Sequence, residues 1–343
     1  MSNKKILISH TFGIGDIIMA IPMLKYLRHT YPGYQIDLFT TNKAVASLMQ
    51  TQAYFNNIYS SARSPKELLA TIVFLRKRKY DYYIVTAASN ASKPIKHGLI
   101  SWLIHAKQRF GEYVNKPMPL YTKNQKFSQE THKVQSNINL AKLISEQAMP
   151  DDLIFYPELT IDKKTETFGQ EWYQIRELDP KKTLIFHIGS SSGGKHRRWS
   201  QENFTKLILR LRQDGWQTVV VSGEDEFEES QIVAQATSSS LLCRQTLLEV
   251  FSVLKRAHAF INADSGLSHL ASAASIKIFS LFGPGDERKT GPYAKESYII
   301  RNTSSSCQRC LYPSKHCTME CMRGLGVDYV YQQIKSRLQE KSK

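Results

Sequence analysis

The chain has 343 residues, 41% of them hydrophobic and 22% charged, which is the balance of a globular protein with room for two domains. No apolar run approaches the roughly 20 residues that a membrane-spanning helix needs, and Ile6-Leu7-Ile8 follows the start without the apolar segment of a secretory signal. We therefore expect a cytoplasmic protein. The formal net charge of +16 favours anionic partners such as nucleic acid, phosphorylated lipid or nucleotide sugars.

The positive charge is unevenly distributed along the chain. Residues 63–147 contain fifteen Lys or Arg and only five Asp or Glu. This excess has two interpretations: a solvated basic face that keeps the protein soluble, or a surface that attracts an acidic partner or acceptor.

The first forty residues have the pattern of one βαβ unit. Residues 4–9 are typical of a buried parallel strand, residues 17–29 of an amphipathic helix, and residues 36–40 of a second strand. In the turn before the helix, Gly13 and Gly15 allow the backbone to approach a ligand at the end of the first strand. The third glycine of the dinucleotide fingerprint is absent, so the turn does not indicate a nicotinamide cofactor.

Asp16 closes this turn and has two interpretations. It is either a capping carboxylate that interacts with the helix dipole, or a general base at the mouth of an interdomain cleft. Further on, residues 82–87 have the pattern of a buried strand, whereas residues 89–135 are polar and irregular. We expect long loops there that offer positive charge to a large polar acceptor, with a partly disordered surface loop as the alternative.

A linker of turn-forming and charged residues, at 149–152 and 157–164, separates this half from a second domain. The second domain opens with a strand at 183–188 and a small-residue loop at 189–195 that is suited to wrapping phosphate. A helix follows at 201–213. The loop lacks the residue order of a P-loop, so it does not indicate an ATPase.

Strands and helices continue to alternate after this loop. The expected elements are strands at 217–221, 258–262 and 276–282, and helices at 250–256 and 267–274. Such alternation predicts α/β domains with parallel sheets covered by helices on both faces. Asp264 and Ser265 precede the helix at 267–274, whose start is expected to face an anion beyond the strand ends.

Taken together, these residues resemble glycosyltransferase family 9, the bacterial lipopolysaccharide heptosyltransferases. The resemblance rests on the order of five motifs across nearly the whole chain: GIGD, HIG followed by KHRRW, SGEDE, NADSGLSHLA and SLFGPGDERKTGPY. It implies a GT-B fold, in which two Rossmann-like domains with parallel sheets face an interdomain cleft. It also implies metal-independent, inverting transfer of a sugar from a nucleotide donor, typically ADP-L-glycero-β-D-manno-heptose, to the lipid A–Kdo inner core.

The resemblance implies roles for individual residues. Asp16 falls on the family's general base, which takes the proton of the acceptor hydroxyl. The donor-binding motif falls on Asp264, Ser265, Gly266, Leu267 and His269. In that motif the helix start receives the diphosphate. The structural alternatives are a helix cap for the first two residues and a buried core side chain for His269.

The second-domain loop departs from the family pattern of Lys-x-Trp-Pro. This chain has the order Lys195-His196-Arg197-Arg198-Trp199-Ser200. Lys195 has the expected chemical type and Arg197 has the expected spacing, so either side chain is a candidate to bind the donor phosphates.

Three further residues complete the expected donor site. Ser190 and Ser191 lie in the small-residue loop that is suited to phosphate. Glu226, or else Asp225, falls near an acidic position that contacts the donor nucleoside in the family. A carboxylate that stabilises the first turn of a helix is the alternative for this position.

The resemblance also divides the chain into functional parts. We expect an N-terminal acceptor-binding domain over residues 1–160, a donor-binding domain over 161–325, and a C-terminal helix over 326–343 that packs back towards the first domain. The enzyme would be peripheral to the cytoplasmic face of the inner membrane and act on a phosphorylated lipopolysaccharide precursor. It would need no cofactor beyond its nucleotide-sugar donor, with ADP-heptose expected.

Four cysteines lie close together near the end of the chain: Cys307, Cys310, Cys317 and Cys321. Thiolates at such spacings can close a structural zinc site. Reduced structural thiols and a redox or disulfide role are the alternatives.

Two other functions are compatible with the sequence. One is a family 9 enzyme that uses another nucleotide sugar or another cell-surface glycan acceptor, because donor motifs fix the diphosphate better than the sugar. The other is a basic nucleic-acid-binding protein. The sequence contains no recognisable nucleic-acid module, so no nucleic-acid partner is expected.

Overall fold

The structure, a computed structural model, describes most of the chain as two compact units. The described residues are 4–61, 64–87, 94–113, 115–128, 130–144, 154–190, 192–304, 309–310 and 317–340. The units are Met1–Thr160 and Ile161–Lys343, and each is considered by itself. Among the described residues, no helix has both the length and the apolar character needed to cross a bilayer.

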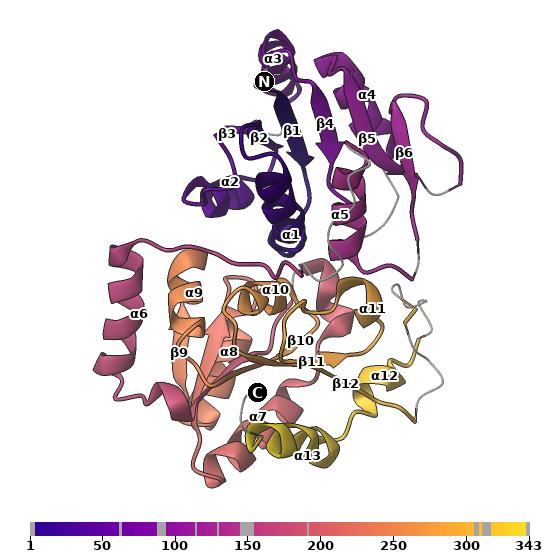
Figure 1. The fold of residues 1–343 in the computed structure, drawn as a ribbon. Coiled ribbons are helices and arrows are strands. Elements are labelled where there is room, and N and C mark those ends of the chain that lie inside the picture. Colours follow the sequence, from indigo (N-terminus) through magenta and orange to yellow (C-terminus); the bar gives the residue numbers. More distant parts are fainter. Residues whose placement is uncertain are drawn as a thin grey trace. The chain divides into compact units, whose positions relative to one another are not determined.

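The first unit is built on a six-stranded parallel sheet with the order β3-β2-β1-β4-β5-β6 (Figure 1). Its strands are β1 (Lys5–His10), β2 (Gln35–Thr40), β3 (Asn57–Ser60), β4 (Tyr82–Val85), β5 (Gln108–Tyr113) and β6 (Lys123–Lys126). Its helices are α1 (Ile14–Thr30), α2 (Lys43–Gln50), α3 (Pro65–Lys77), α4 (Pro94–Ile104) and α5 (Lys133–Lys142).

Different helices cover the two faces of this sheet. The chain steps from β1 to β2 in one direction and from β3 to β4 in the other, so right-handed crossovers put α1 and α2 on one face and α3 and α4 on the opposite face. The core agrees with this arrangement: Leu7, Tyr83 and Val85 of the strands form one buried cluster with Ile72 of α3 and Ile100 of α4. On the other face, α1 contacts α5.

The second unit has a sheet of the same kind, with the order β12-β11-β10-β7-β8-β9. Its strands are β7 (Thr183–His187), β8 (Gln217–Ser222), β9 (Ser240–Cys243), β10 (Ala259–Ala263), β11 (Lys277–Phe282) and β12 (Ser297–Arg301). Its α-helices are α6 (Lys163–Ile175), α7 (Gln201–Gln213), α8 (Phe227–Ala236), α9 (Leu247–Leu254), α10 (Gly266–Ser272), α11 (Glu287–Thr290), α12 (Glu320–Arg323) and α13 (Val327–Leu338). Two 3₁₀ helices, η1 (Pro180–Lys182) and η2 (Ser192–Arg197), flank β7.

The strand order reverses once in each sheet. It does so between β1 and β4 in the first unit and between β7 and β10 in the second. Open α/β sheets bind their ligands beyond the carboxyl ends of the strands at such a switch point. Asp16 follows β1 and Asp264 follows β10, so both expected site segments begin at a switch point.

Most expected elements are present with small shifts at their ends. The predicted helix at 201–213 is α7, and the predicted strand at 183–188 is β7. The helix expected at 17–29 begins earlier, at Ile14, so Asp16 lies inside the first turn of α1 rather than before it. The closing helix α13 packs on α7 within the second unit. Its packing towards the first domain stays a prediction.

The expectation of irregular loops over residues 89–135 is wrong for the described part of that range. It contains α4, β5, β6 and the start of α5. β6 has the sequence KNQK and a partly exposed burial pattern, because it is an edge strand with little apolar surface to bury. α4 is apolar on both sides, so its sequence lacks the one-sided pattern that identifies an amphipathic helix.

Candidate active site

His10 joins the two strands at the switch point of the first unit. Burial lowers the pKa of this histidine to about 4, so its ring is neutral near neutral pH. The Gly13 carbonyl, 3.1 Å from Nε2, can only accept a hydrogen bond, which puts the ring proton on Nε2. Nδ1 is then the acceptor for the Thr86 hydroxyl at 2.9 Å. The ring therefore fixes the turn before α1 to residues that follow β4.

Asp16 uses its two carboxylate oxygens differently. Oδ2 accepts a hydrogen bond from the Gly13 backbone N–H at 3.1 Å, which satisfies an amide at the start of α1. Oδ1 forms an ion pair with Nζ of Lys133 from α5. The side chain remains 20% exposed, so a ligand can reach it. The capping role considered from the sequence is present and is compatible with a role as a base.

Lys133 is a site residue that the sequence reasoning missed. Its side chain is only 4% exposed, and its ammonium lies 5.4 Å from the centre of the Phe12 ring. Phe12 in turn packs on the imidazole of His97 from α4, with 5.5 Å between ring centroids. A carboxylate and an aromatic face thus compensate a buried cation.

The two glycines of this turn have different surroundings. Gly13 precedes α1 with φ −78° and ψ 176°, an extended conformation that any residue adopts. A side chain at Gly13 would meet Asp16 Oδ2 at an ordinary 3.6 Å. Gly15 lies in the first turn of the helix. The fold itself does not require glycine at position 13, which leaves close approach of a ligand as the sequence-based explanation.

His187 has the matching position at the switch point of the second unit. It ends β7, and its Nδ1 lies 3.0 Å from the hydroxyl of Ser265, which follows β10. Its Nε2 lies 3.0 Å from a carboxylate oxygen of Glu226. All three side chains are buried. The sequence predicted Ser265 and Glu226 for the donor site but not the histidine that connects them.

Glu226 is held by partners inside the fold. Burial opposes its ionisation, but hydrogen bonds from His187 and from the Gly223 backbone N–H bring the pKa of its carboxyl below the usual range. A side chain at Gly189 would lie 2.5 Å from Glu226 Cδ, so the strand end and the carboxylate are in close contact. A contact of Glu226 with the donor nucleoside stays a prediction.

Arg198 holds the small-residue loop after β7. Its Nε donates to the Ser190 hydroxyl at 3.1 Å, and its Nη2 donates to the Ser190 carbonyl at 2.9 Å. Nη1 forms an ion pair with Glu229 at 2.7 Å. Arg198 is therefore occupied with structural contacts. Ser191, also expected in the donor site, lies outside the described residues.

Arg197 is the cation that lies against the donor motif. Its Nη1 is 3.2 Å from Oδ2 of Asp264 and its side chain is 31% exposed. Burial raises the pKa of the Asp264 carboxyl, and the nearby guanidinium acts in the opposite direction. Gly194 makes room for this arginine, because a Cβ there would lie 2.8 Å from Nη2. Lys195 is exposed and forms no ion pair within the described part of the chain.

The remaining residues of the donor motif lie on α10. His269 is buried, Leu267 is half-buried and Gly266 is exposed. No atom lies within 4 Å of a Cβ added at Gly266, so neither the packing nor the backbone requires glycine there. In contrast, a Cβ at Gly285 would lie 2.3 Å from an Asp264 oxygen, which brings the loop after β11 against the motif.

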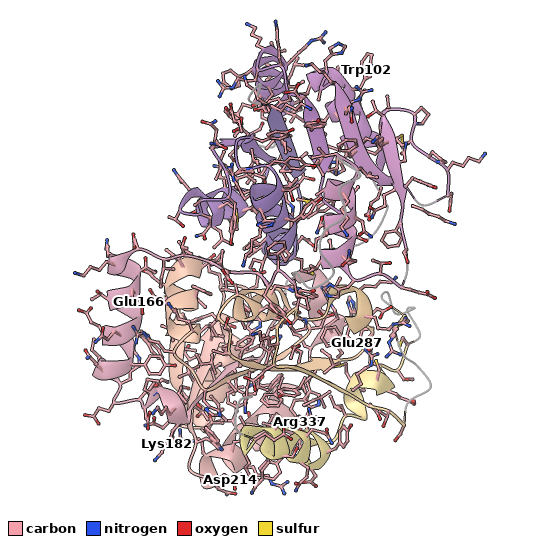
Figure 2. The ribbon with its side chains drawn as sticks, viewed as in Figure 1. Trp102, Glu166, Lys182, Asp214, Glu287 and Arg337 are labelled. Carbon is pink, nitrogen blue, oxygen red and sulfur yellow. The ribbon has the colours of Figure 1, made fainter. Side chains whose placement is uncertain are left out.

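Arg301 of β12 fixes the loop between β11 and α11. Its guanidinium donates to the Gly283 carbonyl at 2.6 Å and to the Gly285 carbonyl at 2.9 Å. It also forms an ion pair at 2.6 Å with Glu287, the first residue of α11, which Figure 2 labels. The buried Arg301 therefore fixes the loop that lies beside Asp264.

The described cysteines near the end of the chain form no disulfide with one another. Cys310 is exposed, Cys317 is half-buried and Cys321 is buried, whereas Cys307 lies outside the described residues. Burial raises the pKa of the Cys321 thiol, and the neighbouring thiols of Cys310 and Cys317 raise it further. Within the described residues, no group of three or more His, Cys, Asp or Glu side chains is arranged to hold a metal ion.

A cavity of about 460 Å³ in the second unit lies at the other end of the strands. Its lining includes Lys182, which precedes β7, and Trp216, which precedes β8. Figure 2 labels Lys182 and Asp214 there. Ligands of open α/β sheets bind at the carboxyl ends of the strands, so this cavity is not the candidate donor site.

Comparison with known proteins identifies relatives over most of the chain. Residues 70–322 match the model of the family described as "Glycosyltransferase family 9 (heptosyltransferase)". The chain is 22% identical over 344 aligned residues to lipooligosaccharide heptosyltransferase 2 of Campylobacter jejuni, which covers 96% of this chain and 98% of the relative. It is 30% identical over 156 residues to lipopolysaccharide heptosyltransferase 1 of Pseudomonas aeruginosa, but spans only 42% of that relative.

Solved structures have the same fold. A family 9 glycosyl transferase from Veillonella parvula aligns with a TM-score of 0.79 and 18% identity over 98% of both chains. The heptosyltransferase WaaC of E. coli, solved with ADP, aligns with a TM-score of 0.74 and 20% identity over 97% of this chain and 99% of its own. The predicted GT-B architecture of two Rossmann-like α/β domains is confirmed. With a family model that covers most of its length, the chain belongs to glycosyltransferase family 9.

Proposed function

We propose that this protein is an inverting, metal-independent heptosyltransferase that moves a heptose from ADP-L-glycero-β-D-manno-heptose to the lipid A–Kdo inner core of lipopolysaccharide. Family membership supports the sugar transfer. The main observation in favour of donor binding is the contact of Arg197 with Asp264 at the switch point between β7 and β10. It brings a partly exposed guanidinium to the residues that resemble the family's donor motif.

On the acceptor side, we assign Asp16 as the general base. As the acceptor oxygen forms its bond to the anomeric carbon, the bond from that carbon to the diphosphate oxygen breaks and the Asp16 carboxylate takes the acceptor proton. Attack opposite to the leaving group inverts the configuration. Support comes from the 20% exposure of Asp16 and from its ion pair with Lys133, which holds the carboxylate at the start of α1.

On the donor side, the leaving ADP carries its negative charge on the diphosphate. Arg197 is the better candidate to neutralise this charge, because its guanidinium is partly buried and its Nε is buried without a hydrogen-bond partner among the described residues. Lys195 is exposed and could act only as a flexible second cation. Ser190 and Ser191 of the same loop, together with Gly266, Leu267 and His269, complete the proposed site.

The choice of ADP rests on relatives. An E. coli heptosyltransferase has been solved with ADP and with ADP-2-deoxy-2-fluoro heptose. We infer the same nucleotide here, with another nucleotide sugar or another cell-surface glycan acceptor as the alternative within the family. A lipid-linked acceptor also implies that the protein works at the surface of the inner membrane, which we propose as its location.

A nucleotide-binding panel tests the donor proposal. ADP and ADP-heptose are expected to raise the thermal unfolding temperature, because a ligand that binds only the folded protein stabilises it by roughly 2.7 kcal/mol at a hundred times its Kd. UDP and GDP are expected to give a much smaller rise. Arg197→Gln should lose most of the ADP response, and Lys206→Gln, which removes an exposed cation of α7, should keep it. An equal response to all three nucleotides, or none to ADP, would contradict the proposal.

A further inference from the structure

Two helices of the first unit carry large apolar side chains on their solvent-facing sides. We call these six residues the apolar face. They are Leu69 (59% exposed), Val73 (49%) and Phe74 (48%) on α3, and Ile95 (68%), Leu99 (45%) and Trp102 (51%) on α4. The other large apolar side chains that are exposed in the described chain are dispersed over residue 154 and four helices of the second unit. The apolar face is therefore a local concentration.

The spacing of these residues makes a continuous stripe on α4. Ile95, Leu99 and Trp102 follow one another at i, i+4 and i+7, which places them on one side of the helix. The opposite side already buries Ile100 and Ile104 in the core under the sheet. Helices that are apolar on both sides are normally buried on both sides. The outer stripe of α4 is instead exposed, as is typical of a surface that binds a partner or a membrane.

The two helices form one surface. α3 and α4 contact each other on the same face of the sheet. On α3, Leu69 and Val73 lie one turn apart on the outer side, while Ile72 and Leu75 point into the core. Figure 2 labels Trp102 at the outer side of α4.

Positive charge surrounds the apolar face. Lys66, Arg76, Lys77 and Lys96 are exposed on the same two helices and form no ion pair within the described part of the chain. Residues 64–107 contain eight Lys or Arg and two Asp or Glu, and one of these acids, Asp81, is paired with Lys107. Apolar side chains with a cationic rim match the composition of elements that lie in the interface of an anionic bilayer.

The apolar face also begins close to the proposed acceptor site. His97 of α4 lies between Ile95 and Leu99 in sequence but points inward, where its Nε2 is 3.3 Å from the Thr11 hydroxyl. Thr11 belongs to the turn that leads to Asp16. α4 therefore carries the outer stripe on one side and contacts the turn that leads to the proposed base through His97 on the other.

We propose that the apolar face, with its basic rim, docks the first unit onto an anionic phospholipid bilayer. The purpose of this membrane contact rests on the proposed function, because a lipid-anchored acceptor is presented at such a surface. Apolar side chains enter the boundary between headgroups and acyl chains, and the surrounding Lys and Arg bind the anionic headgroups. Docking through α4 brings the turn of Asp16 close to the acceptor.

The charge of this surface argues against a second copy as its occupant. A symmetric dimer through the apolar face would bring two basic rims together, and like charges at an interface oppose association. An anionic membrane instead complements the rim. We therefore take an anionic bilayer as the partner of the apolar face, and self-association of the protein is measured alongside vesicle binding.

Vesicle binding tests the proposal directly. The full-length protein is expected to sediment with vesicles that contain phosphatidylglycerol and to bind pure phosphatidylcholine vesicles much more weakly. The double variant Leu99→Gln/Trp102→Gln should lower binding to the anionic vesicles by about tenfold or more. The matched control is Ile175→Gln/Ile232→Gln, which removes two exposed apolar side chains (77% and 55%) from the second unit and should bind like the wild type.

The fluorescence of Trp102 gives a second readout. The other tryptophans, Trp172, Trp199 and Trp216, are buried or half-buried, so a blue shift on addition of anionic vesicles would report Trp102. The shift should be absent in Trp102→Phe. The triple variant Lys66→Gln/Lys77→Gln/Lys96→Gln should weaken vesicle binding and its dependence on salt.

Three results would overturn the proposal. They are equal binding of wild type and Leu99→Gln/Trp102→Gln to anionic vesicles, no binding by either protein, and a concentration-dependent dimer that only the wild type forms. ADP binding is measured on the same samples. If the wild type binds anionic vesicles but not ADP, only the proposed function is contradicted, because vesicle binding does not depend on the donor.

Discussion

His10 and His187 have equivalent places in the two units. Each ends the first strand of its sheet and contacts a hydroxyl that follows the neighbouring strand across the switch point, Thr86 in one unit and Ser265 in the other. Their second ring nitrogens face different partners. His10 faces the Gly13 carbonyl, whereas His187 faces the Glu226 carboxylate. The same position thus ties a turn to the sheet in one unit and orders a carboxylate in the other.

His10 makes the stability of the protein sensitive to acid. Its pKa is about 4 in the folded protein and 6.5 for an unperturbed histidine. Between these values the unfolded chain binds more protons, so stability is full above pH 6.5 and falls as the pH drops towards 4, by roughly 3 kcal/mol at most. Urea unfolding at pH 7 and pH 4.5 measures the loss. His10→Asn, which cannot titrate there, should lose this part of the pH dependence.

The control for this measurement is an exposed histidine of the same unit. His105→Asn changes a surface residue at φ 61°, a backbone conformation that asparagine tolerates, and should follow the wild-type curve. If His10→Asn and the wild type lose equal stability between pH 7 and pH 4.5, the buried neutral histidine is not the cause.

Some site residues could not be predicted from the sequence because their partners are distant in the chain. Lys133 pairs with a carboxylate 117 residues away, and His187 contacts partners 39 and 78 residues away. A lysine at the start of a polar segment and a histidine at a strand end carry no local signal of these contacts. The motif residues Asp16 and Asp264, in contrast, are recognisable because their glycine-rich turns are local in sequence.

At the scale of an element, a substitution at the start of α10 tests whether the donor diphosphate approaches the backbone of this helix. Gly266 begins this helix, and a Cβ there would meet no atom within 4 Å. Gly266→Ala should therefore leave the thermal unfolding temperature unchanged or slightly raised, since alanine is the better helix former. If the donor diphosphate approaches this backbone, the same variant should weaken ADP binding by about tenfold, measured by calorimetry.

Gly326 provides the matched control for this change. It precedes α13 in the same unit with φ −72°, and a Cβ there would also meet open space. Gly326→Ala should leave ADP affinity unchanged. Unchanged affinity in Gly266→Ala as well would remove the start of α10 from the donor site.

The elements of the two units were predictable to different degrees. The second unit alternates buried β-strands such as β7 and β10 with amphipathic helices such as α7, and these were identified with small errors at their ends. In the first unit, β6 is the edge strand, β5 lies beside it, and both have polar sequences. α4 is apolar on both sides. The alternation of a half-buried strand and the one-sided pattern of an amphipathic helix are therefore absent there. The apolar outer stripe of α4 removes the one-sided pattern by which an amphipathic helix is recognised in a sequence. We propose the same stripe for membrane docking.

At the scale of the whole molecule, the order of motifs predicted the family and fold, whereas the chemistry still depends on single residues. The α/β alternation and the family match are properties of the full chain. The assignment of Asp16 as base combines the resemblance with its exposed carboxylate and its ion pair with Lys133. Neither kind of observation alone would distinguish a base from a capping residue.

The rate of heptose transfer from ADP-heptose to lipid A–Kdo, followed by mass spectrometry, tests the account most directly. Wild-type protein should add one heptose, and Asp16→Asn should lower the rate by about 10²- to 10⁴-fold while ADP binding survives. Asp81→Asn breaks another carboxylate–lysine pair of the first unit, with Lys107, at the amino end of β4, and should transfer at the wild-type rate. No transfer by the wild type, or near wild-type transfer by Asp16→Asn, would contradict the account.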